Sequence, residues 1–242
     1  MRIRFAKYAE EFAMMQIYTL IRSFMETEMI KLLHIKASPR DGLSHSSKAA
    51  DSFIAALRDN TSDVTVTELD IWDADLPHLN GPLLAAKYAR LAGRAFTGDE
   101  ASAWDQIGEL VRNLDVAHAI LISSPMWNMS IPYRLKHYID LVTQPGLSFS
   151  FDPSTGYTPL LRARPVVVVL ASSGDFSQGP SWGRPDLASP YLTEALKFIG
   201  LTRAEIVRVG PTIGNPHAVA ASAQRAAVTL ASIAERFAEI AS

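Results

Sequence analysis

Hydrophobic residues along the chain gather in five short runs, which alternate with longer stretches of mixed polarity. We expect each run to be a β-strand, because the runs are short, rich in β-branched residues and bounded by polar or turn-forming positions. The predicted strands are Ile30–Ile35, Val64–Leu69, Ala119–Ser123, Pro165–Ala171 and Ala204–Val209. Several are almost continuously apolar, which is typical of parallel strands that are covered on both faces.

The stretches between these runs carry apolar residues at helical spacing. They predict helices at about Ser46–Arg58, Ser102–Asn113, Ile131–Thr143, Asp186–Ile199 and Pro216–Ile240. Residues 147–158 read as a β-hairpin between the third helix and the fourth strand. Strict alternation of strand and helix predicts an α/β fold, a doubly wound parallel sheet of five strands in the order 2-1-3-4-5 with helices on both faces.

Residues 1–28 precede the first predicted strand and stand apart from this pattern. Apolar residues such as Phe5, Tyr8 and Phe12 follow helical spacing, but charged residues interrupt every apolar stretch, so the segment is neither a membrane span nor a secretory signal. We expect one domain at residues 29–242. Residues 1–28 are then an N-terminal extension, either upstream of a true start at Met29 or a loosely docked helix.

The composition of the chain excludes several kinds of site and partner. The chain has 242 residues, a net charge of −2 and no cysteine, so disulfides, thiolate nucleophiles and Fe–S clusters are excluded, and redox chemistry would need a bound cofactor. The near-neutral charge gives no electrostatic reason to bind nucleic acid or an anionic membrane. The histidines lack metal-ligand spacing, and His34, within a predicted strand, is expected to be a core residue with its hydrogen bonds satisfied. We expect a cytoplasmic protein without a metal.

Serines cluster where the second predicted element begins. Ser44, Ser46 and Ser47 follow a loop containing Gly42, at the start of the predicted helix Ser46–Arg58. Hydroxyls and free backbone amides at the positive end of a helix form an anion site. There is no Walker A lysine and no G-x-G-x-x-G after a strand. The sequence therefore indicates a monophosphate.

A second candidate segment, Met126–Met129, follows the predicted strand Ala119–Ser123. An aromatic and a carboxamide at the carboxyl end of a parallel strand lie where open α/β sheets bind their ligands. Met126 and Trp127 can pack against a flat apolar ring while backbone amides meet its edge, as a flavin requires. The monophosphate and the flat ring together fit FMN.

These segments belong to a longer series whose order and spacing resemble a known family. The series comprises Ala37–Arg40, Ser44–Ser46, Pro125–Met129, Leu135–Asp140, Gly146–Phe149, and Pro190–Leu192 followed by Phe198–Gly200. From Met29 to the C-terminus, the chain resembles FMN-dependent NADH-azoreductases of the flavodoxin-like NAD(P)H:quinone reductase group.

The resemblance implies a homodimeric flavoenzyme with its active sites at the dimer interface. NADH would be the donor and an azo compound or quinone the acceptor, in a two-electron ping-pong reaction in which flavin N5 carries the chemistry and no side chain is catalytic. The implied cofactor-binding residues are Ser38, Ser44, His45 and Ser46 at the phosphate, Met126, Trp127, Asn128 and Met129 at the ring, and Ser172, Ser173, Gly174 and Asp175 along its pyrimidine side. Phe151 and Phe176 are implied as walls of a substrate pocket.

Two positions depart from the family pattern. Trp127 stands where the family usually has tyrosine, and Ser172–Asp175 stands where it usually has Ser-Arg-Gly-Gly. The second departure removes an arginine and adds the carboxylate of Asp175. We expect that change to disfavour negative charge on the reduced flavin.

Two other functions remain as alternatives. A flavodoxin-type electron carrier or sensor would bind FMN without catalysis, although the small net charge is unlike that of acidic carriers. A serine hydrolase or phosphodiesterase is suggested by Gly179–Gly183, which matches G-x-S-x-G and precedes Asp186 and His217. That motif needs a strand directly before it and a helix directly after it, whereas the fourth predicted strand ends at Ala171 and Arg184-Pro185 interrupts the exit.

Overall fold

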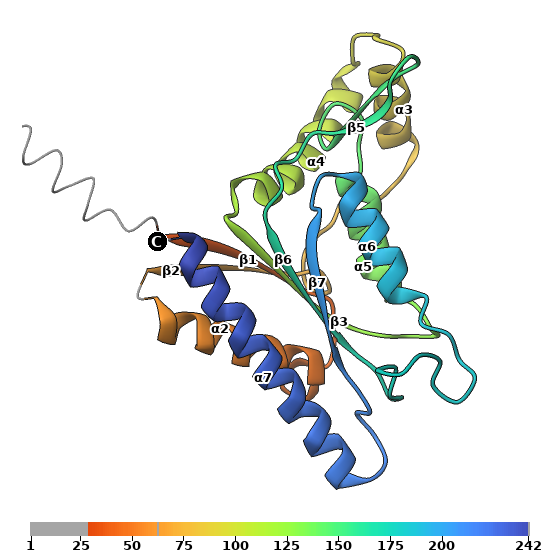
Figure 1. Cartoon of the computed structure of the whole chain (residues 1–242). Helices are drawn as coiled ribbons and strands as arrows, with labels where there is room; N and C mark the ends of the chain where they lie inside the picture. The colour runs from red at the N-terminus through yellow and green to blue at the C-terminus, as the bar shows by residue number, and fades with distance from the viewer. Residues whose placement is uncertain (1–28, 62, 242) are drawn as a thin grey trace, which may run out of the picture.

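The central element of the computed structural model is a sheet of five parallel strands in the order β2-β1-β3-β6-β7 (Figure 1). The strands are β1 (Ile30–Lys36), β2 (Val64–Asp70), β3 (Ala119–Pro125), β6 (Pro165–Ala171) and β7 (Arg203–Val209). Each overlaps a strand predicted from the sequence. The structure describes residues 29–61 and 63–241, so our expectations for residues 1–28 lie outside it.

Helices cover both faces of the sheet, as predicted (Figure 1). One face carries α2 (His45–Asn60) and α7 (Pro216–Ala241), which meet where Phe53 packs edge-on against Phe237 at 5.5 Å between ring centroids. The opposite face carries α3 (Gly81–Leu91), α4 (Gly98–Val116), α5 (Tyr133–Val142) and α6 (Ala188–Phe198). Both faces of β3 and β6 are therefore buried, which accounts for their continuous apolar sequences.

Among the α-helices of the described residues, α3 was not predicted. α3 begins at the N-cap Asn80, whose side chain accepts a hydrogen bond from the Leu83 amide, and Pro82 stands in its first turn. These are ordinary helix-start signals. The helix buries only Leu83 and two alanines, so its apolar stripe is too weak to recognise by periodicity.

The predicted hairpin forms outside the main sheet. β4 (Phe149–Asp152) and β5 (Gly156–Pro159) pair antiparallel, with Phe151 opposite Tyr157. Phe149 is buried, but Phe151 is about half exposed (51%) and its ring lies 4.8 Å from that of Tyr157.

His34 is buried within β1, but only half of its hydrogen-bonding capacity is satisfied. Nε2 lies 2.9 Å from the Ser123 hydroxyl oxygen, whereas buried Nδ1 has no hydrogen-bond partner. The expectation of a fully satisfied core histidine is therefore wrong at Nδ1, which lies 3.9 Å from a Glu68 carboxylate oxygen.

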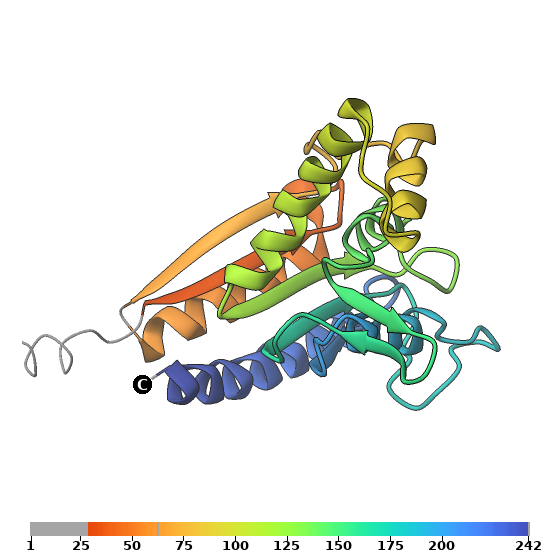
Figure 2. The same cartoon turned by 90° about the horizontal axis from the view of Figure 1, so that it is seen from above.

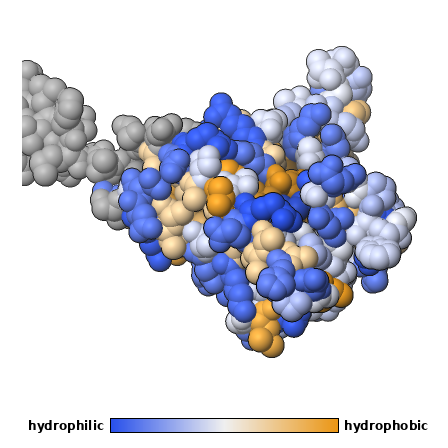
Figure 3. Space-filling view, turned by 60° about the horizontal axis from the view of Figure 1, so that its bottom comes forward, coloured by the Kyte–Doolittle hydropathy of each residue, from blue (hydrophilic) through white to orange (hydrophobic). Residues whose placement is uncertain are grey.

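The loops that follow the sheet strands gather at one end of the molecule, opposite the start of β1 (Figure 2). On the face drawn in Figure 3, apolar residues lie in patches separated by hydrophilic ones. Within residues 29–61 and 63–241, no helix combines the length and apolarity needed to cross a membrane.

Candidate functional site

A cavity of about 650 Å³ opens at the carboxyl ends of β1, β3, β6 and β7. This is where open α/β sheets bind their ligands, and the volume is typical of a small-molecule site. It is lined by Ser38, Arg40, Ser44, His45, Ser46, Pro125, Met126, Trp127, Asn128, Met129, Ala171, Ser172, Ser173, Phe176, Arg184, Thr212 and Ile213. The structure thus brings together most of the site residues predicted from the sequence.

Ser44 forms the first wall by capping α2. Its backbone is extended, and its hydroxyl oxygen accepts a 3.1 Å hydrogen bond from the Ser47 amide. The same oxygen lies 3.0 Å from the hydroxyl of Ser46, and both side chains are buried. The amides of His45 and Ser46 have no acceptor within the helix, because they belong to its first turn. This wall therefore offers hydroxyl and amide donors at the positive end of a helix.

The electrostatics of this wall also favour an anion. Arg40 lies in the loop between β1 and α2 and lines the cavity. Burial, followed by the nearby charges of Lys48 and Arg40, lowers the pKa of His45. None of the residues that line the cavity is acidic.

The second wall is a tight turn that follows β3. The Trp127 amide donates to the Ser130 carbonyl at 2.8 Å, and the Ser130 amide donates back to Trp127 at 2.9 Å. The two central residues, Asn128 and Met129, have positive φ angles of 49° and 70°. Asparagine tolerates this conformation, but methionine adopts it rarely. Such local strain is typical of functional sites, because the surrounding structure must maintain it.

An aromatic cluster supports the second wall from behind. Trp72, in the segment after β2, packs against Trp127 and, edge-on, against Tyr133 at 5.3 Å between centroids. Arg134 of α5 donates to the carbonyls of Ile71 (2.7 Å) and Ala74 (3.0 Å), which holds this segment against the helix. The cluster fixes the position of the Trp127 ring, which is 37% exposed.

Ser172 begins the third wall, at the end of β6. Its amide donates to Val209, its carbonyl accepts from Thr212 at 3.0 Å, and its hydroxyl donates to the Gly174 carbonyl at 2.8 Å. Gly174 itself does not line the cavity. A side chain there would collide with Ser181, so this glycine is needed for packing.

Asp175 departs most from its predicted place. It is exposed and does not line the cavity. Its carboxylate accepts a 2.9 Å hydrogen bond from the Ser177 amide, and hydrogen bonds from Ser177 lower its pKa. The carboxylate is thus engaged in its own loop and does not bring negative charge to the cavity wall.

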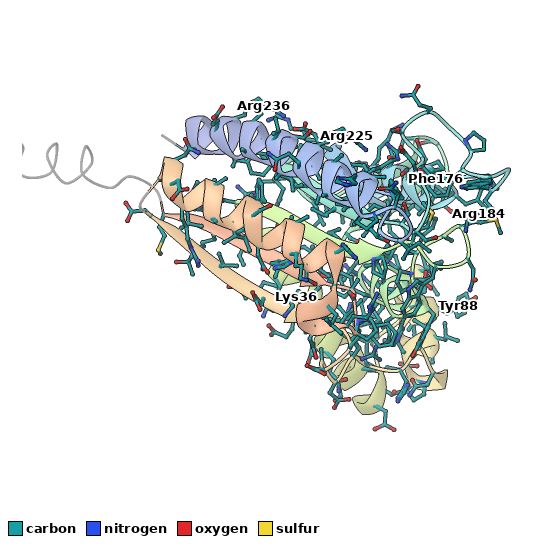
Figure 4. The ribbon with its side chains drawn as sticks, turned by 90° about the horizontal axis from the view of Figure 1, so that it is seen from below. Lys36, Tyr88, Phe176, Arg184, Arg225 and Arg236 are labelled. Carbon is teal, nitrogen blue, oxygen red and sulfur yellow. The ribbon has the colours of Figure 1, made fainter. Side chains whose placement is uncertain are left out.

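The loop that contains Asp175 instead brings Arg184 to the cavity. Ser181 and Arg184 exchange two backbone hydrogen bonds of 3.0 Å across a two-residue turn, in which Trp182 and Gly183 have φ angles of 55° and 76°. Buried Ser181 packs on Gly174, while Trp182 is 94% exposed at the tip. Phe176 and Arg184 lie together at this end of the molecule (Figure 4).

The two predicted pocket phenylalanines have different positions. Phe176 is buried and lines the cavity. Phe151 does not line the cavity and packs on Tyr157 in the β4–β5 hairpin. Phe151 is thus no part of the cavity within this chain, and its role as a pocket wall stays a prediction.

The residues of the suggested hydrolase do not form a catalytic triad. Asp186 accepts hydrogen bonds from Ser189 and Arg208, and His217 lies exposed in the first turn of α7. Among the hydrogen bonds of the described residues, none joins Ser181 to His217. Ser181 flanks a two-residue turn and pairs with Arg184. It therefore does not stand between a strand and a helix, as the nucleophile of a hydrolase must.

The sequence did not single out Arg40, Arg184, Thr212 and Ile213 as site residues. Thr212 and Ile213 could have been found, because they follow the last strand at the same edge of the sheet. Arg40 lies within the serine-rich loop, where a cation beside hydroxyls was an available signal. Arg184 had no such signal, because the packing of Ser181 on Gly174 determines its position.

Comparison with known proteins agrees with this geometry. Residues 30–233 match the family described as having a flavodoxin-like fold. The chain is 42% identical over 209 residues to FMN-dependent NADH:quinone oxidoreductase 1 of Bradyrhizobium diazoefficiens, covering 86% of this chain and all of that protein. It is 41% identical over 212 residues to FMN-dependent NADH:quinone oxidoreductase 3 of Pseudomonas fluorescens, covering 87% and 98%. An FMN-dependent NADH-azoreductase from Bacillus anthracis, solved in complex with FMN, superposes with a TM-score of 0.75 at 25% identity, covering 87% of this chain and all of that one.

Proposed function

The chain belongs to the flavodoxin-like family that its residues 30–233 match, and we propose that it is an FMN-dependent NADH:quinone oxidoreductase that also reduces azo compounds. It binds FMN as its cofactor and takes electrons from NADH. The FMN-binding domain that we propose comprises residues 29–242.

One observation carries this proposal: an anion-binding helix start and an aromatic turn line the same cavity. Ser38, Ser44 and Ser46 offer hydroxyls, α2 offers first-turn amides, and Arg40 offers a positive charge, which together suit a phosphate. Met126 and Trp127 line the cavity and offer an apolar surface, which suits a flat heteroaromatic ring. The residues present therefore fit FMN.

The residues that line the cavity would bind and orient FMN. None of their side chains can itself exchange electrons with NADH. Bound FMN supplies the two-electron, hydride-transfer chemistry. The His45 imidazole, which lines the cavity, can donate an N–H to a phosphate oxygen. The turn Trp127–Ser130 holds the aromatic wall, and buried Phe176 adds a further apolar surface to the cavity.

We propose ping-pong kinetics because donor and acceptor would both reach the ring through the cavity that holds it. The described residues form one cavity that contains both the anion-binding wall and the aromatic turn, so donor and acceptor would use its open face in succession. Initial rates measured with NADH at several fixed quinone concentrations should give parallel double-reciprocal lines. Intersecting lines would refute the shared face, and absence of NADH-dependent quinone reduction by FMN-loaded protein would refute the function.

We also propose a cytoplasmic homodimer whose partner subunit completes the cavity. Trp127 and Met129 line the cavity and are exposed, and Leu187, whose amide donates to the Met129 carbonyl at 2.9 Å, is exposed as well. Covering them would shield the acceptor site from water. The lack of cysteine suits a reducing compartment. Light scattering at micromolar concentration should give twice the chain mass of 26.5 kDa, and a monomer mass would contradict the dimer.

A further inference from the structure

The charge at the third wall of the cavity is the reverse of what the sequence of that wall indicates. Ser173 provides no positive charge and Asp175 follows it closely in the chain, yet Asp175 is turned to Ser177 and does not line the cavity. Arg184 does line it. The cavity therefore has a cation on the side where the sequence suggested a carboxylate.

The fold holds Arg184 at this wall. The turn from Ser181 to Arg184 is closed by two backbone hydrogen bonds, and it rests on Gly174 through the side chain of Ser181. The Arg184 Nε donates to the Ser181 carbonyl at 3.3 Å. Within the described part of the chain, no carboxylate forms an ion pair with Arg184. Its guanidinium is thus available to a ligand.

Arg184 and Arg40 enter the cavity from different walls. Arg40 follows β1 and Arg184 belongs to the loop after β6, and β3 lies between these two strands. Two strand spacings separate the bases of the two loops by roughly 10 Å. Arg40 stands beside the serines and the start of α2, which already suit a phosphate. The two arginines thus reach the cavity from loops that follow different strands, and Arg184 does not belong to the wall that suits a phosphate.

We propose that Arg184 stabilises the negative charge that the ring system of bound FMN acquires on reduction, in place of an arginine at position 173. This inference rests on the proposed function, because it takes FMN as the occupant. A guanidinium facing the ring favours the reduced over the oxidised cofactor by charge attraction. Arg184 then sets the reduction potential, which decides how readily the enzyme takes electrons from NADH and passes them on.

The test compares three substitutions in the full-length protein loaded with FMN. Arg184→Met removes the charge, Arg184→Lys keeps it, and Arg225→Met removes an exposed arginine of α7 that does not line the cavity (Figure 4). The midpoint potential is measured by spectroelectrochemical titration, and the dissociation constant of oxidised FMN by fluorescence quenching. Arg184→Met should lower the preference for reduced FMN about tenfold, which lowers the potential by about 30 mV for a two-electron couple. Arg184→Lys should retain most of the parent value, and Arg225→Met all of it.

A double variant, Ser173→Arg with Arg184→Met, tests the location of the charge. Ser173 lines the same wall, so an arginine there should raise the potential back toward that of the parent. The inference is overturned if Arg184→Met has the parent potential, or if Arg225→Met lowers it equally. A parent protein that binds no FMN would instead overturn the proposed function and this inference with it, so the two failures are distinguishable.

Discussion

The indole rings of Trp72 and Trp127 lie 5.6 Å apart between centroids, inclined at 56°. Trp127 lines the cavity, whereas Trp72 belongs to a different loop and does not. The hydrogen bonds from Arg134 to the carbonyls on either side of Trp72 keep that loop in place. Trp72, which lies outside the cavity, thus supports the ring of Trp127 from behind.

Replacing Trp72 should weaken FMN binding although Trp72 does not line the cavity. Trp72→Ala removes an aromatic pair worth about 0.5–1.5 kcal/mol and lets the Trp127 ring move, so the dissociation constant should rise roughly twofold to tenfold. Trp72→Phe keeps a ring at this position and should bind FMN nearly as the parent does. Titration by flavin fluorescence quenching provides the comparison. Equal affinity for Trp72→Ala and the parent would show that the cluster does not support the wall.

The buried histidine of β1 should make the fold sensitive to mild acid. Burial, only partly offset by Glu68, lowers the pKa of His34 to about 4 from an unfolded value of 6.5. Between pH 6.5 and pH 4, His34 is protonated in the unfolded chain but not in the folded chain. The free energy of unfolding therefore decreases as the pH falls from 6.5 toward 4. The loss from this group should be about 2 kcal/mol at pH 5 and negligible above pH 7.

Urea unfolding at pH 7.5 and pH 5.0 measures this effect, with His34→Gln as the matched control. Glutamine can keep the hydrogen bond to Ser123 but does not titrate. The control should therefore lose less stability than the parent between the two pH values. An identical loss in both proteins would place the acid sensitivity elsewhere.

Arg164 should matter for stability and not for the cofactor. This buried residue donates to the carbonyls of Leu114, Asp115 and Ala117 at the end of α4, and it pairs with the Asp115 carboxylate at 2.9 Å. Arg164→Met leaves these acceptors without their donor and should destabilise the fold by roughly 2–4 kcal/mol. Arg162→Met removes one 3.4 Å hydrogen bond of an exposed side chain and should have little effect.

Thermal unfolding measures the effect of Arg164→Met on stability, and FMN titration measures its effect on cofactor binding. Arg164 precedes β6, at the end of the strand opposite the cavity. The folded Arg164→Met protein should therefore bind FMN with the parent affinity. A melting temperature equal to that of the parent would show that water replaces the guanidinium without cost.

The central strands β1, β3 and β6 were predictable because they are apolar on both faces, whereas β2 and β7 were recognised from alternating β-branched and polar residues. The anion wall was predictable because the start of a helix and its capping serines are local features of sequence. The turn at Trp127 was found for the same reason: it directly follows an apolar strand. Each of these elements depends on residues close together in the chain.

Expectation and structure differ for side chains whose direction depends on contacts between separate segments. Asp175 was expected beside the ligand, but the nearby Ser177 amide binds its carboxylate. Arg184 was overlooked, because it lies ten positions after Gly174, on which its turn packs through Ser181. Phe151 packs within the hairpin, where only tertiary structure could place it. Spacing along a loop does not determine which of its charges faces a cavity.

The affinity for FMN of a Ser44→Ala, Ser46→Ala double variant tests the central claim most directly. Each hydrogen bond to a charged group contributes about 1.5–3 kcal/mol, so the double variant should bind FMN at least about 100-fold more weakly than the parent. Ser52→Ala on the same helix, whose hydroxyl bonds to Ala49 outside the cavity, should bind as the parent does. Because Ser44→Ala also removes the N-cap of α2, the melting temperature of each variant is measured to show how much stability that loss costs. If the folded double variant binds FMN with the parent affinity, the phosphate is not held at the start of α2, and the account of this site is wrong.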